Sequence, residues 1–132
     1  RISNNNYVKL DSLTTYYSRW LQYGYRNMTL YHNYTLSEGD NLELYSVFSY
    51  STMVACVLVS KEDKKLWFIE WGHGIYSPTT SKQITQLSNY LLRAYSEYDF
   101  KDYHICKNSA KALIKEIYEN YKHTDPRGFD IY

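Results

Sequence analysis

A cysteine and a histidine two residues apart are the first residues whose types and spacing could support catalysis. On a strand, Cys106 and His104 would lie on the same side, where an imidazole could activate a thiol nucleophile. His73, between two glycines, is the best single candidate for a general acid or base, with Glu70 nearby. No G-x-S-x-G motif offers a serine nucleophile.

For each of these candidates a structural role is favoured, because buried Cys–His pairs and inert loop histidines are far commoner than catalytic ones. The sequence therefore predicts no catalytic residues and no enzyme. A small enzyme that uses His73 or the His104–Cys106 pair is kept as an alternative.

The two cysteines and four histidines raise the question of a zinc site. Structural zinc sites usually draw ligands from C-x-x-C or H-x-x-x-H spacings, and the chain has neither. We therefore expect no metal and no other cofactor. Cys56 and Cys106 both stand in apolar stretches, so we expect both thiols to be reduced and buried.

The segment YSPTTSK, at Tyr76–Lys82, combines a proline, several hydroxyl groups and a lysine. Pro78 fixes its own φ and favours an extended residue before it. The hydroxyl groups of Thr79, Thr80 and Ser81 can each accept a hydrogen bond from a free backbone N–H group in the first turn of a helix. Thr80 and Gln83 have the spacing of a capping box. The start of a helix is the favoured interpretation, and a phosphate or other anion site that uses Lys82 is the alternative.

The elements that would position these residues begin with a helix and a sheet. Asp11 and the pattern after it predict a helix that ends at Gly24. Alternating apolar residues then predict a hairpin and two further strands. The strand that contains the run Met53–Val59 should be central, because it is apolar on both faces. The four predicted strands are 28–36, 41–50, 51–59 and 66–71.

After Ser81 the apolar spacing changes to three and four residues, which predicts a helix over Thr80–Tyr98. A short strand is expected at Tyr103–Cys106, and Asn108 should cap a second helix. The inner stripe of that helix should consist of Ala112, Leu113, Ile117 and Tyr121.

Together, these elements predict an α+β fold. It should consist of a small antiparallel sheet of three to four strands, covered on one face by two to three helices. We expect a single domain over 1–132, in which 125–132 can form a loose tail.

The composition argues against two classes of partner. With 15 Lys and Arg against 14 Asp and Glu, the net charge of +1 gives no long-range attraction to nucleic acid or to an anionic membrane. No apolar run reaches membrane-spanning length, which favours an intracellular protein without a membrane partner. The 17 tyrosines are unusual. Codon bias in an AT-rich genome is the favoured cause, and a tyrosine-rich binding surface is the alternative.

Two segments carry a resemblance to known proteins: YSVFSYSTMVA at Tyr45–Ala55 and YSPTTSK at Tyr76–Lys82. They are similar to the YSYxTxVA strand and the YSxTTSKH corner of an uncharacterised family of short proteins from bacteriophages of low-GC Gram-positive hosts. The similarity extends over roughly Tyr45–Tyr98, and Gln83 stands where that family usually has a histidine. The resemblance implies no activity. It implies a phage or other mobile element as the source and a bacterial cytoplasm as the location.

The function expected from these observations is that of a non-enzymatic accessory protein of a phage or mobile element. It would bind and block a host protein or ribonucleoprotein, such as a defence nuclease, in the manner of an anti-CRISPR protein. The candidate partner-binding residues are Tyr31, His73, Tyr76, Lys82, Tyr95 and Tyr98. The alternative is a nucleic-acid-binding protein, in which tyrosine rings stack on the bases and basic side chains contact the phosphates of the nucleic acid. The basic residues suggested for this role are Arg19, Arg26, Lys61, Lys64, Lys65 and Lys82.

Overall fold

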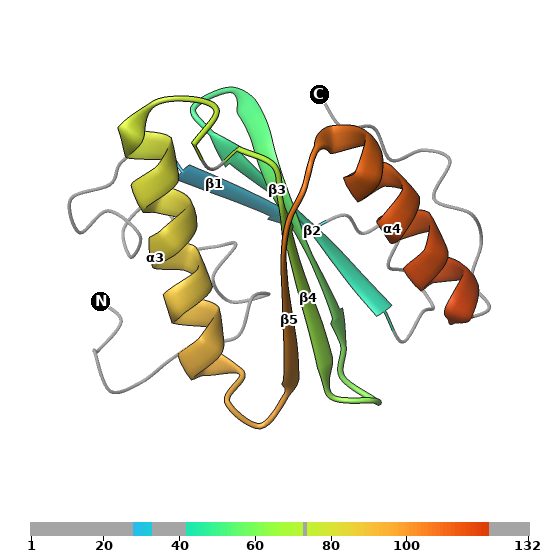
Figure 1. The fold of residues 1–132 in the computed structure, drawn as a ribbon. Coiled ribbons are helices and arrows are strands. Elements are labelled where there is room, and N and C mark those ends of the chain that lie inside the picture. The colour runs from blue at the N-terminus through green and yellow to red at the C-terminus, as the bar shows by residue number, and fades with distance from the viewer. Residues whose placement is uncertain (1–27, 33–41, 73, 122–132) are drawn as a thin grey trace.

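The computed structural model describes residues 28–32, 42–72 and 74–121, which form one small α+β domain (Figure 1). The predicted fold class is confirmed. A five-stranded sheet lies between two helices, α3 (Pro78–Ala94) and α4 (Lys107–Asn120). The strands are β1 (Met28–His32), β2 (Leu42–Ser49), β3 (Thr52–Ser60), β4 (Lys65–Glu70) and β5 (Asp99–His104).

The strands lie in the sheet in the order β1-β2-β3-β4-β5. Every neighbouring pair is antiparallel except β4 and β5, which are parallel. A parallel pair needs a long crossover connection, and α3 supplies it. The predicted antiparallel arrangement therefore holds from β1 to β4, and β5 adds a parallel strand at the edge.

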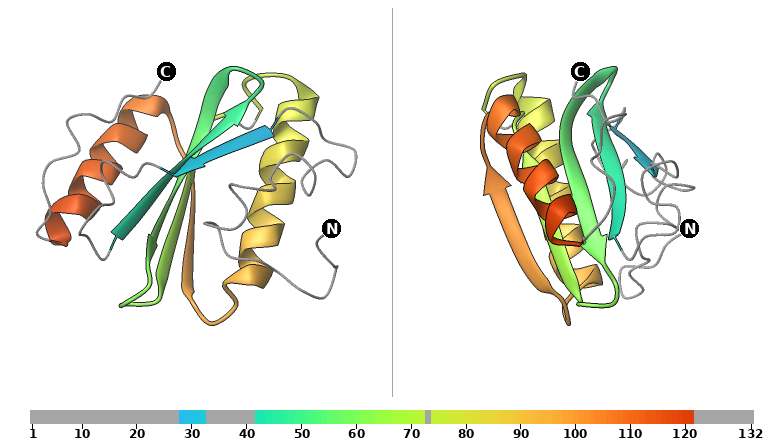
Figure 2. Two further views of the ribbon diagram at one scale, coloured as in Figure 1. Left: turned by 180° about the vertical axis from the view of Figure 1, so that it is seen from behind. Right: turned by 90° about the vertical axis from the view of Figure 1, so that its right-hand side faces the viewer.

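Side chains of β3 alternate between two apolar clusters, one on each face of the sheet. Val57 and Val59 pack on the side of α3, whereas Cys56 and Leu58 pack on the side of α4. The expectation that helices cover only one face is wrong, because α3 covers one face and α4 covers the other (Figures 1 and 2). The physical reason is that a strand with apolar side chains on both sides needs shielding from water on both.

The predicted amphipathic helix is confirmed in α3, although its ends differ. It starts at Pro78, slightly before the predicted Thr80, and it ends at Ala94 with Tyr95 as the C-cap residue, short of the predicted Tyr98. Its buried stripe has the predicted spacing: Ile84, Leu87, Tyr90, Leu91 and Ala94. This stripe joins the side chains of β3 and β4 in one cluster.

Two predictions for the C-terminal half are corrected. β5 begins at Asp99 instead of Tyr103, and it is defined by its pairing with β4. α4 begins at Lys107 with Cys106 in the N-cap position, so Asn108 lies inside the helix. Ala112 is exposed, because the buried stripe lies on a slightly different face: Ala110, Ile114, Ile117 and Tyr118.

Several expectations fall on parts of the chain outside the described residues. These are the helix between Asp11 and Gly24, the strand residues 33–36 and the tail at 125–132. Of the helices that the structure does describe, none combines the length and apolarity needed to cross a membrane.

Candidate functional site

The turn between β2 and β3 places a tyrosine in an unusual backbone conformation. Ser49 pairs with Thr52, so Tyr50 and Ser51 alone make the turn. Tyr50 has a φ of 57°, a value that hairpin turns usually assign to Gly, Asn or Asp. A residue with a Cβ pays about 1 kcal/mol or more for this conformation. The Tyr50 side chain is nevertheless 59% exposed, so it does not recover that cost by packing in the core.

A second loop, between β4 and α3, carries two further exposed apolar side chains. Ile75 is 72% exposed and Tyr76 is 40% exposed. The backbone N–H groups of both residues donate to the carbonyl of Gly72, at 3.2 and 3.4 Å. Gly74 in the same loop has a φ of 77° and donates its N–H to the Ser81 hydroxyl at 2.9 Å. The loop is therefore held by its own hydrogen bonds and by α3.

A β-bulge and a tryptophan hold this loop against the start of β3. Val47 pairs with Ala55 and Phe48 pairs with Met53, which leaves Val54 as an extra residue in β3. The Trp71 backbone N–H donates to the Val54 carbonyl at 3.0 Å, and Trp71 Nε1 donates to the Met53 carbonyl at 3.1 Å. One residue thus satisfies two carbonyl groups at the bulge and fixes the position of the loop relative to β3.

A chain of buried hydroxyl groups joins the hairpin to the first turns of α3. Ser49 Oγ donates to Gln83 Oε1 at 2.6 Å. Because a hydroxyl carries one proton, Ser49 Oγ must accept from Thr80 Oγ1 at 3.0 Å, and Thr80 must in turn accept from Ser77 Oγ at 3.2 Å. Ser49, Thr80 and Gln83 are all buried. The chain of hydrogen bonds therefore fixes the hairpin turn relative to the start of α3.

The same contacts correct the predicted details of the YSPTTSK segment. The N-cap residue of α3 is Ser77, whose side chain accepts from the Thr80 N–H at 3.2 Å, with Pro78 in the first turn. Thr80 and Gln83 do not form a capping box, because their side chains bond to Ser49. The favoured interpretation of the segment as the start of a helix is confirmed.

Tyr50, Ile75 and Tyr76 form what we call the tip surface. The β2–β3 turn and the β4–α3 loop lie at the same end of the domain, at the top of Figure 1. Among the described residues, the large apolar side chains that are exposed are these three and Leu92, which lies near the other end of α3. The neighbouring segments 49–54 and 74–81 contain no Asp, Glu, Lys or Arg. An aromatic surface without charges is typical of the core of a protein–protein interface.

No family model, curated protein or solved structure matches the chain. The resemblance to a phage protein family therefore stays a prediction.

The predicted partner-binding residues are distributed unevenly. Tyr76 is part of the tip surface, and Lys82 is exposed one turn into α3. Tyr95 was expected on the surface, and this is wrong, because the ring is only 2% exposed and packs in the core. Tyr98 is half-buried against it, with ring centroids 4.9 Å apart. His73 and the side chain of Tyr31 lie outside the described residues.

The alternative Cys–His pair is not brought together as a nucleophile and its base. His104 Nδ1 lies 3.2 Å from Glu70 Oε1, and Cys106 Sγ donates to Ser109 Oγ at 3.3 Å. The expectation of two buried thiols holds for Cys56 and is wrong for Cys106, which is exposed at the start of α4. Within the described part of the chain, no three His, Cys, Asp or Glu side chains gather in a way that could hold a metal ion.

The two thiols should differ sharply in reactivity. The Ser109 hydroxyl and backbone N–H groups at the start of α4 lower the pKa of Cys106, whereas burial raises the pKa of Cys56. We therefore expect iodoacetamide to alkylate Cys106 in the native protein and Cys56 only after unfolding, as read by peptide mass spectrometry. Equal labelling of both thiols under native conditions would contradict the burial of Cys56.

Proposed function

We propose that this protein is a non-enzymatic binding module that uses the tip surface to dock on a partner protein and block it. The observation that carries the proposal is Tyr50, whose exposed ring occupies a left-handed turn position. Glycine would make this turn at lower cost. Strained backbone conformations cluster at functional sites. Of the two non-glycine residues with a positive φ in the described chain, Tyr50 and Lys64, Tyr50 is the one that presents a large exposed apolar side chain.

The rigidity of the tip surface supports the same role. Trp71 and the buried Ser49 hydroxyl hold the two loops in place before any partner arrives. A preorganised surface loses little conformational entropy on binding, so more of its contact energy contributes to affinity. Tyrosine adds to this, because a large ring buries much area with few rotatable bonds.

The composition of the tip surface favours a protein partner over nucleic acid. Binding to nucleic acid depends on lysine and arginine contacts with phosphates, and Lys82 is the charged residue next to the segment 74–81. Elsewhere Lys61, one of the cations suggested for nucleic-acid binding, lies 3.6 Å from the Glu43 carboxylate. We infer that the partner is a protein, or the protein part of a ribonucleoprotein.

The resemblance to phage proteins suggests the biological setting. On that basis the protein would come from a phage or mobile element and act in a bacterial cytoplasm. Its target would be a host protein such as a defence nuclease, which it would inhibit in an anti-CRISPR-like manner by occluding a surface, with no cofactor and no turnover.

Site-specific photo-crosslinking tests the proposal. A photoreactive amino acid replaces Ile75. In a matched control it replaces Leu92, which lies about 20 Å along α3 from the first residue of that helix. Both proteins are irradiated in a lysate of a low-GC Gram-positive bacterium. We expect a discrete protein adduct from position 75 that survives nuclease treatment and disappears when unlabelled wild-type protein competes.

Two outcomes would contradict the proposal. One is an adduct that forms equally well from Leu92, which would show that the tip surface is not the docking surface. The other is crosslinking to nucleic acid alone, which would favour the nucleic-acid-binding alternative.

A further inference from the structure

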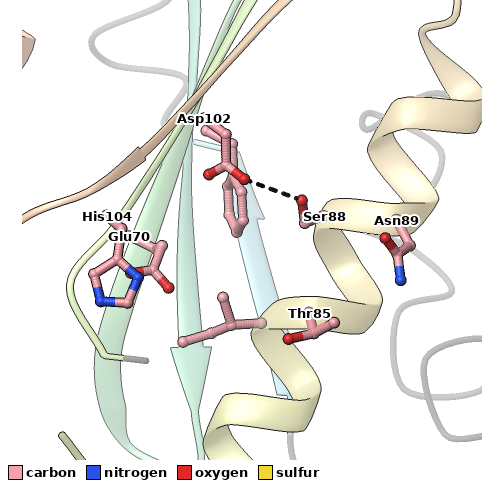
Figure 3. Close-up of a pocket in the computed structure, with 8 residues that line it drawn as sticks. Glu70, Thr85, Ser88, Asn89, Asp102 and His104 are labelled. Atoms are coloured by element: carbon pink, nitrogen blue, oxygen red, sulfur yellow. Dashed lines mark hydrogen bonds and ion pairs between the residues drawn. The ribbon is translucent and has the colours of Figure 1, made fainter. Parts of the chain in front are cut away.

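A cavity of about 330 Å³ lies between α3 and the last two strands, on the face of the sheet that α3 covers (Figure 3). Its polar lining comes from both sides: Glu70, Thr85, Ser88, Asn89, Asp102 and His104. Phe68 and Ile84 add an apolar wall. This volume lies at the lower end of the range found for small-molecule sites in proteins.

The parallel register of β4 and β5 brings two carboxylates to this cavity. Glu70 pairs with His104, and Phe68 pairs with Asp102, so all four side chains belong to the same face of the sheet. Glu70 is only 3% exposed, and its Oε1 lies 3.2 Å from His104 Nδ1. Asp102 faces Ser88 on α3, which donates to Asp102 Oδ2 at 3.4 Å (Figure 3).

The described lining has an excess of negative charge. It contains two carboxylates and one histidine, and it includes no lysine or arginine. Burial raises the pKa of Asp102, and the opposing effects of the Ser88 hydrogen bond and of His104 do not cancel it. A cation beside Asp102 would stabilise the charged form of this partly desolvated carboxyl group and so lower its pKa.

The nature of the lining favours an organic cation over a metal ion. The described Asp, Glu, His and Cys side chains do not form a metal-binding group here. Ammonium and guanidinium groups, by contrast, donate several hydrogen bonds and can use hydroxyl, amide and carboxylate acceptors spread over two elements. Phe68 and Ile84 offer an apolar contact for the alkyl chain that carries such a group.

We propose that this cavity binds an organic cation with an alkyl-ammonium or guanidinium head, which bonds to the Asp102 carboxylate and the Ser88 hydroxyl and is attracted by the negative charge of the buried Glu70 carboxylate behind them. The site is separate from the tip surface and does not depend on the function proposed for it. The cation can come from a diffusible amine or from the lysine or arginine side chain of another protein.

Calorimetric titration of the purified protein tests this site. The probes are agmatine, an acetylated arginine amide, the neutral diol 1,4-butanediol and magnesium chloride. We expect one molecule of agmatine to bind per chain, and neither the diol nor magnesium to bind. Binding of the arginine amide with comparable affinity would identify a protein side chain as the source, and binding of agmatine alone would identify a diffusible amine.

The matched variants are Asp102→Asn and Asp99→Asn. Asp102→Asn should weaken agmatine binding by about tenfold or more, because it removes a charge-assisted hydrogen bond. Asp99 lies on the same strand, outside the cavity lining, and is exposed, so Asp99→Asn removes the same charge and should leave binding unchanged. Both positions are exposed enough for the variants to fold. Absence of agmatine binding, equal loss in the two variants, or tighter binding of magnesium would each overturn the proposal.

Discussion

Replacing Ile75 and Tyr76 together by serine should lower the affinity for the partner by at least about a hundredfold while the fold remains intact. Central anchors of an interface each contribute about 2 kcal/mol or more, and a tenfold change in affinity corresponds to about 1.4 kcal/mol. Ile75 projects largely into solvent and Tyr76 is 40% exposed, so the double variant should lose only about 1 kcal/mol of unfolding free energy. Affinity is measured against the partner identified by crosslinking, and stability by urea unfolding.

Leu92→Ser is the matched control for this variant. It also removes an exposed apolar side chain, but at the opposite end of α3. We expect it to bind the partner like the wild type. If the double variant retained wild-type affinity, or if Leu92→Ser lost as much, the tip surface would not be the docking surface.

Replacing Ser49 by alanine should destabilise the fold by about 1–3 kcal/mol. The substitution removes the hydroxyl that donates to Gln83 Oε1 and accepts from Thr80 Oγ1, both in buried positions. Each partner then loses a hydrogen bond where water has little access, which costs more than the bond itself contributes. The midpoint of urea unfolding should fall without a change in the slope of the transition.

Two further variants test the assigned hydroxyl chain. Ser51→Ala removes an exposed hydroxyl in the same turn and should change the free energy of unfolding by only about 0.5 kcal/mol. The double variant Ser49→Ala with Gln83→Met should cost less than the sum of its two single variants, because no acceptor is then left without its donor. Strict additivity, or equal effects of Ser49→Ala and Ser51→Ala, would show that the hydroxyl chain does not join the hairpin to α3.

The sequence predicted the elements whose side chains repeat regularly. β3 and α3 were found because strands and helices with long apolar faces display their period directly. β5 was misplaced because its sequence DFKDYH has mostly polar residues, as suits an exposed edge strand, and gains its structure from pairing with β4. The coverage of both faces was missed, although the doubly apolar β3 already required it.

The candidate site was only partly predictable, because most of its contacts join distant segments. The sequence places Tyr50 at the end of a strand, because Tyr50–Ser51 contains no Gly, Pro, Asn or Asp to mark a turn. The role of Thr80 and Gln83 depends on Ser49, which is 31 and 34 residues away in the chain. Tyr95 was expected on the surface, but it follows the buried stripe of α3 into the core. Tyr76 was correctly expected to be exposed near the start of that helix.

The most direct test of the tip surface is to measure both stability and partner affinity for Tyr50→Gly. Glycine relieves the cost of the left-handed φ, so the free energy of unfolding should stay equal or rise by about 1 kcal/mol. Partner affinity should fall by about thirtyfold, as expected when a central tyrosine is removed from an interface. A gain in stability together with a loss of binding would support the inference that Tyr50 is kept at this position for its side chain. Unchanged affinity, or a loss of stability with normal binding, would contradict it.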